Sequence, residues 1–336
     1  MDVVKESLNV AGLLTNVYAR PDLREKRSSG PVVALFFLHG RRTVRRCRRP
    51  ACARGVRLGG REAGLFEAET PGIHSGVLRT WRPRGFLSVS ETIRVQDDRS
   101  RRRRRRRGPR YVQDQRNHGE RTVDERGNLG WSLKAERHNE RYAVDMYGMI
   151  VGAVKDVSFL IEVLPTFLFP NDERTIDEWV LAGFSLGGHA TWLALRHEPR
   201  IRIGISICGC PEYLALMEQH AKRLGGISLT PPRIPASLRA LVRAHEAASE
   251  PPAAVFAGKR VLVMAIEDDP LVPWAASRAF VEALDVGRGG RKEVAVEPGE
   301  RHEITGGMRE RMFRFFWEEA LVVGGANVRE RERSAL

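Results

Sequence analysis

The chain has 336 residues and a formal net charge of +14, and its length suits one large domain built around a single sheet. The positive charge is concentrated in residues 41–110, which contain 22 arginines, no lysine and six acidic residues. The rest of the chain is close to neutral, so the overall charge does not identify a nucleic-acid-binding protein.

Four cysteines are too few for a disulfide scaffold in a chain of this length, which favours a reducing, cytoplasmic location. Cys208-Gly-Cys210 resembles half of a metal site, but no second Cys or His pair follows at zinc spacing, so we expect no metal. The first residues lack the basic start and apolar core of a signal peptide. The nearest apolar run, residues 31–38, is far shorter than the roughly 20 residues that span a bilayer, so we expect no membrane partner.

Residues 1–40 are expected to form the N-terminal strands of the domain. Within them, the continuously apolar residues 31–38 predict a strand that is covered on both faces. This strand should stop at His39-Gly40, where the chain leaves the sheet.

Residues 41–110, here called the Arg-rich segment, show neither helical nor strand periodicity and offer few apolar side chains. They predict a disordered or poorly packed insertion, after which only residues 111–113 have the character of a strand. A genuine inserted arm would have this composition. A misread exon or shifted reading frame would have it too, because arginine rises abruptly while lysine is absent, and sequencing the transcript decides between the two.

From residue 111 to residue 322, apolar runs alternate with helical patterns. Strands are expected over residues 179–182, 201–207, 260–266 and 292–296. Helices are expected over residues 142–164, which Pro165 should close, 188–197 and 308–320. The irregular stretch 224–258, with a helical piece at 237–245, should cover the active site, and residues 323–336 form a polar tail. The alternation predicts an α/β fold with a mostly parallel central sheet and helices on both faces.

The segment Gly183-Phe184-Ser185-Leu186-Gly187 lies between a predicted strand and a predicted helix, where a nucleophile elbow is found. The turn in such an elbow is so tight that the residues two positions before and after the serine must be small. A glycine-rich packing turn would give the same pattern, so catalytic partners are required. A serine hydroxyl needs a nearby base to remove its proton, usually a histidine held by a carboxylate.

Two loops after later predicted strands carry such partners. One contains Glu267, Asp268 and Asp269, and the other contains His302. Both loops resemble those of α/β-hydrolase esterases related to the dienelactone hydrolase and prolyl oligopeptidase branches, in the segments Asp269-Pro270-Leu271-Val272-Pro273 and Gly299-Glu300-Arg301-His302-Glu303. The resemblance, which covers roughly residues 1–40 and 111–322, implies the α/β-hydrolase fold. It also implies Ser185 as nucleophile, Asp269 as the orienting acid and His302 as the general base.

The resemblance implies an oxyanion hole made of two backbone amides. One is the amide of Leu186, which follows the nucleophile at the positive end of the next helix. The second belongs to Arg41 or a neighbour, in a histidine-glycine loop after the first core strand. Residues 114–121 resemble the Asp-x-Arg-x-His-Gly turn of these esterases, which implies a scaffolding role for that loop and for His118.

We therefore expect a serine hydrolase that cleaves a small-molecule carboxylic ester, rather than a peptide amide, with no cofactor or metal. Two alternatives stay open. In one, the Arg-rich segment binds nucleic-acid phosphates; Trp81 and Phe86 are nearly its only aromatic residues, so such adhesion would be nonspecific. In the other, the insertion at Arg41 spoils the oxyanion loop and the hydrolase fold is inactive.

Overall fold

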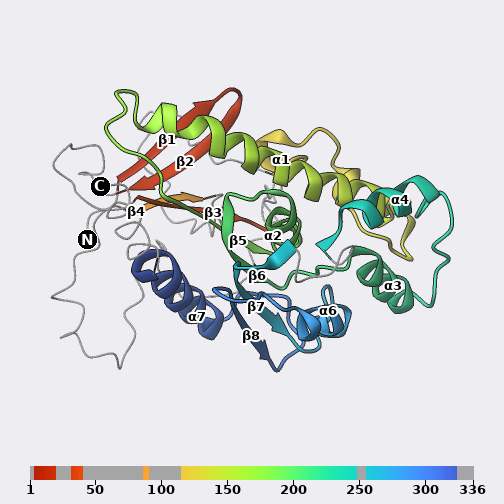
Figure 1. The fold of residues 1–336 in the computed structure, drawn as a ribbon. Helices are drawn as coiled ribbons and strands as arrows, with labels where there is room; N and C mark the ends of the chain where they lie inside the picture. Colours follow the sequence, from red (N-terminus) through yellow and green to blue (C-terminus); the bar gives the residue numbers. More distant parts are fainter. Residues whose placement is uncertain (1–3, 20–31, 41–85, 91–114, 248–254, 324–336) are drawn as a thin grey trace, which may run out of the picture.

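A computed structural model describes residues 4–19, 32–40, 86–90, 115–247 and 255–323. Their strands form one eight-stranded sheet in the order β1-β2-β4-β3-β5-β6-β7-β8 (Figure 1). Two neighbouring pairs are antiparallel, β1 with β2 and β2 with β4. The remaining pairs are parallel, so one direction is shared by β4, β3, β5, β6, β7 and β8. The predicted α/β fold with a mostly parallel central sheet is confirmed.

The bounds of the elements follow the apolar runs of the sequence. The strands are β1 (Val4–Val10), β2 (Leu13–Ala19), β3 (Val33–Leu38), β4 (Phe86–Ser90), β5 (Glu178–Phe184), β6 (Ile201–Ile207), β7 (Arg260–Ile266) and β8 (Arg291–Glu297). The main helices are α1 (Tyr142–Leu168), α2 (Leu186–His197), α3 (Tyr213–Arg223), α4 (Ala236–His245), α6 (Arg278–Ala283) and α7 (Gly306–Phe316), which continues as a π-helical segment (Trp317–Val323). Among the described residues, none of the helices is both long and apolar enough to cross a membrane.

Alternate side chains of the central strands are buried on opposite faces of the sheet, as expected where helices cover both sides. In β3, the residues that join the core shared with α1 and α2 are Ala34, Phe36 and Leu38. The residues that join the core shared with α7 are Val33, Leu35 and Phe37. Burial of each large apolar side chain contributes about 1.5–3 kcal/mol, so the sheet is a firm support for the loops at its edge.

The prediction that Pro165 closes its helix is wrong. α1 continues to Leu168, and the N–H of Phe169 donates to the carbonyl oxygen of Pro165 (2.8 Å). A proline removes one backbone donor from a helix, and here it does so near the helix end. The extra turn keeps Leu168 buried in the core shared by α1, α2 and the sheet, only 2 % exposed, and this burial outweighs the lost hydrogen bond.

The Arg-rich segment contributes a strand that its composition did not predict. β4 lies between β2 and β3, antiparallel to the first and parallel to the second. Only four of its residues alternate between apolar and polar, too short a pattern to stand out among arginines. β4 occupies the place in the sheet for which the sequence offered only residues 111–113. Those residues, the rest of the Arg-rich segment and the tail from residue 324 onward lie outside the described residues.

Candidate active site

The carboxyl ends of β5, β6, β7 and β8 lie at one edge of the sheet because these strands are parallel. Ser185 directly follows β5, and Cys208 directly follows β6. Asp269 lies in the loop after β7, and His302 lies in the loop after β8. This edge therefore gathers a hydroxyl, a thiol, a carboxylate and an imidazole.

Ser185 occupies the sharp turn that the glycine pattern predicts. Its φ of 55° and ψ of −112° strain a residue that carries a side chain. Its N–H donates to the carbonyl oxygen of Ile207 in β6 (2.8 Å), which holds the turn in place. A Cβ at Gly183 would overlap the carbonyl group of Gly187, and a Cβ at Gly187 would overlap the carbonyl group of Leu38. Both obstacles are backbone, so only glycine fits at either position.

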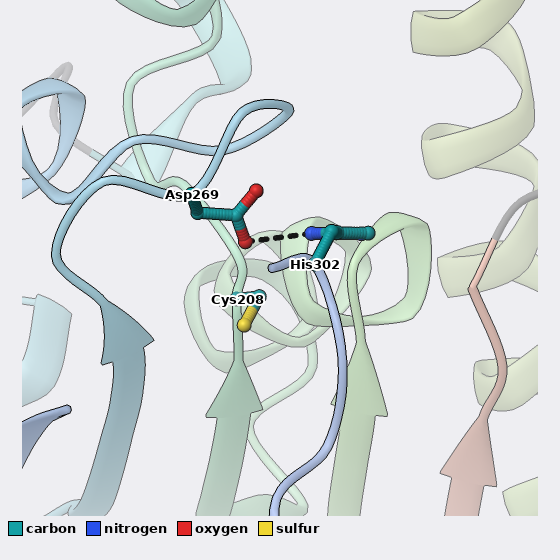
Figure 2. A group of neighbouring side chains, drawn as sticks. All are labelled: Cys208, Asp269 and His302. Carbon is teal, nitrogen blue, oxygen red and sulfur yellow. Dashed lines mark hydrogen bonds and ion pairs between the residues drawn. The ribbon is translucent and has the colours of Figure 1, made fainter. Parts of the chain in front are cut away.

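His302 joins Ser185 to Asp269. Its Nε2 lies 2.7 Å from Ser185 Oγ, and its Nδ1 lies 2.6 Å from Asp269 Oδ2. Figure 2 shows the pair formed by Asp269 and His302 at the carboxyl end of the sheet. Because an ionised carboxylate only accepts, Nδ1 carries the proton and Nε2 accepts the Ser185 hydroxyl. The structure thus brings together the three side chains that the sequence picks out, two of them 117 residues apart.

Asp269 is held as a buried, ionised acceptor. It is 1 % exposed, and its Oδ1 accepts the N–H groups of Leu271 (2.8 Å) and Val272 (3.0 Å). Burial acts to raise the pKa of Asp269, but the hydrogen bond and charge of His302 and the two amides outweigh it and hold the pKa below its usual value. Asp268 is exposed. Asp269 is therefore the carboxylate placed to orient the imidazole.

Cys208 is buried, and its position beside Asp269 is one that the sequence analysis did not foresee. Its Sγ, an oxygen of Asp269 and a nitrogen of His302 all lie within 4.8 Å of one another (Figure 2). Burial and the negative charge of Asp269 raise the pKa of the thiol. A metal could use this spacing only by displacing a proton from the thiol and breaking the bond between the acid and the imidazole. The arrangement is that of a neutral thiol packed under a hydrogen-bonded acid and base.

The sequence analysis also missed two hydrogen bonds that support the loop after β7, which carries Asp269. His220 of α3 donates from Nε2 to the carbonyl oxygen of Leu271 (2.5 Å). In the neutral ring, Nδ1 then accepts the hydroxyl of Tyr142 at the start of α1 (3.0 Å). These two hydrogen bonds fix the loop that carries Asp269. No sequence signal indicates it, because His220 and Leu271 are 51 residues apart and no motif contains both.

The structure describes one of the two residues whose amides are predicted to form the oxyanion hole. Leu186 is buried at the first position of α2, directly after Ser185. Gly40 is also buried, and a Cβ there would lie 2.8 Å from Phe184, so the loop after β3 packs against the elbow. Arg41, the second predicted donor, lies outside the described residues.

The turn that begins at residue 115 ties this loop to α1. The side-chain amide of Gln115 donates to the carbonyl oxygen of His39. Arg116 forms an ion pair with Asp156 of α1 (2.8 Å). The ring of His118 packs edge-on against the ring of His39, with 5.6 Å between centroids. These contacts suit the scaffolding role that the resemblance implies.

Solved structures share this architecture over nearly the whole chain. The protein TT1662 from Thermus thermophilus is 22 % identical, and the match covers 96 % of this chain and 99 % of that one with a TM-score of 0.56. The chain has the α/β-hydrolase fold. Acetyl xylan esterase 1 from Thermoanaerobacterium sp. JW/SL YS485 matches with a lower score (16 % identity, 94 % of this chain and 87 % of that one, TM-score 0.49). Dipeptidyl peptidase 4 from Porphyromonas gingivalis does so too (12 % identity, 94 % and 35 %, TM-score 0.49). No protein-family model and no curated protein sequence matches it.

Substitution of one glycine should disrupt the elbow. In Gly187→Ala the added methyl group overlaps the backbone of Leu38 in β3, and neither backbone can rotate away. We expect the free energy of unfolding to fall by about 3 kcal/mol or more. Gly148→Ala is the matched control: it lies on the exposed side of α1 with nothing within 4 Å of the added methyl. It should stabilise the protein by about 0.5–1 kcal/mol. Thermal and urea unfolding would compare the two, and equal stabilities would contradict the packing described for the elbow.

Proposed function

We propose that this α/β-hydrolase is a serine hydrolase that cleaves carboxylic esters through an acyl-enzyme on Ser185. One observation carries the proposal: hydrogen-bonding distances run without a break from Ser185 through His302 to Asp269. A serine hydroxyl becomes a useful nucleophile only when a positioned base removes its proton during attack. His302 is the base in this proposal, and Asp269 keeps it in the required tautomer.

Acylation begins with attack of Ser185 Oγ on the carbonyl carbon of the ester, while the hydroxyl proton moves to His302 Nε2. The imidazolium that forms lies beside the ionised Asp269, which stabilises it. The C–O bond to the alcohol then breaks, and His302 gives its proton to the departing oxygen. The acyl group stays on Ser185. A water molecule takes the place of the alcohol, loses a proton to His302 and releases the acid, which restores the Ser185 hydroxyl.

The carbonyl oxygen gains negative charge in both steps and needs donors. The Leu186 amide is one donor in this proposal, and the dipole of α2 adds positive potential there. The Arg41 amide is the second. Loss of one such donor costs about 3–4 kcal/mol of transition-state stabilisation.

A fluorophosphonate probe tests the proposal because it reacts with activated serines. We expect a single adduct on Ser185, identified by peptide mass spectrometry, and no adduct in Ser185→Ala. Release of p-nitrophenol from p-nitrophenyl acetate should follow the same pattern. Folded wild-type protein that neither labels nor turns over would refute the proposal. Salt-sensitive retention of such a protein on an oligonucleotide column would favour the nucleic-acid alternative.

We infer that the substrate is a small ester rather than a peptide, since resonance stabilises an ester carbonyl less than an amide carbonyl and a hydroxyl attacks it more readily. Turnover of a p-nitrophenyl ester with no measurable turnover of the matching p-nitroanilide would support this, because a serine peptidase would cleave both. We place the enzyme in a reducing cytoplasm because Cys208 and Cys210 are free thiols. Contacts of the Arg-rich segment with nucleic acid are expected to be nonspecific.

A further inference from the structure

His189 lies one helical turn after Ser185, in the first turn of α2. Its backbone N–H donates to the carbonyl oxygen of Ser185 (2.9 Å), and the residue is only 4 % exposed. The ring lies close enough to His302, Asp269 and His220 for their charges to act on it. A polar ring is therefore buried beside the reacting groups without a part in the hydrolytic steps.

The backbone at Cys210 decides which nitrogen of His189 carries the proton. The Cys210 N–H lies 2.8 Å from Nδ1, and because an amide N–H only donates, Nδ1 accepts. The Cys210 carbonyl oxygen lies 3.2 Å from the same nitrogen, but a proton on Nδ1 would point at the amide hydrogen. Nδ1 is therefore unprotonated, and Nε2 of the neutral ring carries the proton.

Burial keeps this ring neutral. It lowers the pKa of His189 to about 4, so at neutral pH the ring is not a cation. With Nδ1 occupied, the ring also has no free lone pair with which to act as a base. What it offers is one neutral N–H donor in a fixed direction. Such a donor suits an ether, hydroxyl or carbonyl oxygen, whereas carboxylates and phosphates are bound chiefly by cations.

The Nε2–H group has no hydrogen-bond partner within the part of the chain that the structure describes, and the atom is shielded from solvent. A buried donor left unpaired costs about 1–3 kcal/mol. In native proteins the great majority of such groups are paired, with another protein group, an ordered water or a bound ligand. His189 lies one helical turn after Ser185, so an oxygen atom of the bound substrate would satisfy Nε2–H once the side chains that now shield this atom move apart.

We propose that His189 Nε2–H binds a neutral oxygen atom in the acyl chain of the substrate and makes the enzyme selective for oxygen-bearing acyl groups. The acyl part is chosen over the alcohol because it becomes bonded to Ser185, one turn away from His189, while the alcohol departs beside His302. This inference rests on the proposed function. It gives His189 a role in specificity and none in proton transfer.

Matched p-nitrophenyl esters test the inference. Each alkanoate is paired with an analogue in which an ether oxygen replaces one methylene, at the third, fourth or fifth position of the acyl chain. The selectivity is the ratio of kcat/KM for the ether ester to that for its alkyl partner. Alkaline hydrolysis of the same pairs supplies the ratio that chemical reactivity alone produces. Wild-type selectivity should exceed this chemical ratio by about tenfold at the position that reaches Nε2.

Two variants separate recognition from structure. In His189→Asn the side-chain oxygen can still accept the Cys210 N–H, but no donor reaches the position of Nε2. The enhanced selectivity should disappear while fluorophosphonate labelling of Ser185 persists. In His189→Gln the amide N–H extends toward the position of Nε2, and part of the selectivity should return.

Two results would overturn the inference. One is wild-type selectivity no greater than the chemical ratio at all three positions, a measurement that needs no variant to fold. The other is an unchanged selectivity in a labelled His189→Asn protein. Failure of the proposed function looks different, because the wild-type enzyme would then neither label nor turn over any of the esters.

Discussion

Ser185→Ala and His302→Ala should each lower kcat for p-nitrophenyl acetate by about 10⁶-fold, and the double variant should be no slower than either. The reason is that the hydroxyl and the imidazole, 2.7 Å apart, act as one unit. Without the hydroxyl, His302 has no nucleophile to deprotonate. Without the imidazole, the hydroxyl keeps its proton and attacks poorly.

Steady-state kinetics on the two single variants and the double variant make the test a complete cycle. Matching melting temperatures would show that the fold survives in each. Stopped-flow release of p-nitrophenol would show whether wild type forms an acyl-enzyme faster than it hydrolyses it. Losses that multiply in the double variant would mean that the two residues act independently, which contradicts the mechanism.

Three of the strands that carry the site, β5, β6 and β7, could be predicted because they are buried on both faces. β6 and β7 coincide with the predicted ranges 201–207 and 260–266, since a strand without a solvent face has a continuous apolar sequence. β4 has no such run, and its place in the sheet comes from pairing with β2 and β3. The C-terminal end of α1 was missed because the cost of Pro165 is local, whereas the gain from burying Leu168 depends on tertiary packing.

The site was accessible to sequence reasoning only where chemistry restricts the residue type. Gly183 and Gly187 mark the elbow because no side chain fits beside the backbone there. The choice among three adjacent acids depended on a resemblance, whereas the structure shows its cause in the amides of Leu271 and Val272. The tautomer of His189 depends on an amide 21 residues away, which no local pattern encodes.

α4 lies at Ala236–His245, where the sequence predicts a short helix, but its expected role as a cover of the site stays a prediction. The role of the Arg41 amide as an oxyanion donor also stays a prediction. Arg41 opens the Arg-rich segment, and the oxyanion loop needs a backbone geometry that composition alone cannot specify. The neighbouring Gly40 is packed against the elbow, so the described part of that loop is suitably placed.

Asp269→Asn should lower kcat by about 10⁴-fold with little loss of stability, because it reverses the tautomer of His302. The asparagine oxygen can take the place of Oδ1 and accept the amides of Leu271 and Val272. Its NH₂ group then faces Nδ1 and donates where a carboxylate accepted. Nδ1 loses its proton, Nε2 gains one, and the imidazole can no longer accept the proton of Ser185.

Asp268→Asn is the matched control, since it makes the same chemical change one residue earlier on an exposed side chain. It should leave kcat within about twofold of wild type, because surface substitutions away from such contacts have small effects. Kinetics of both variants on one ester distinguish a tautomer effect from a general loss of negative charge at the site. Equal damage in the two variants would favour the charge, and damage confined to Asp268→Asn would transfer the orienting role to that neighbour. A loss of kcat in Asp269→Asn alone is what the hydrogen bond from His302 Nδ1 to the buried carboxylate of Asp269 predicts.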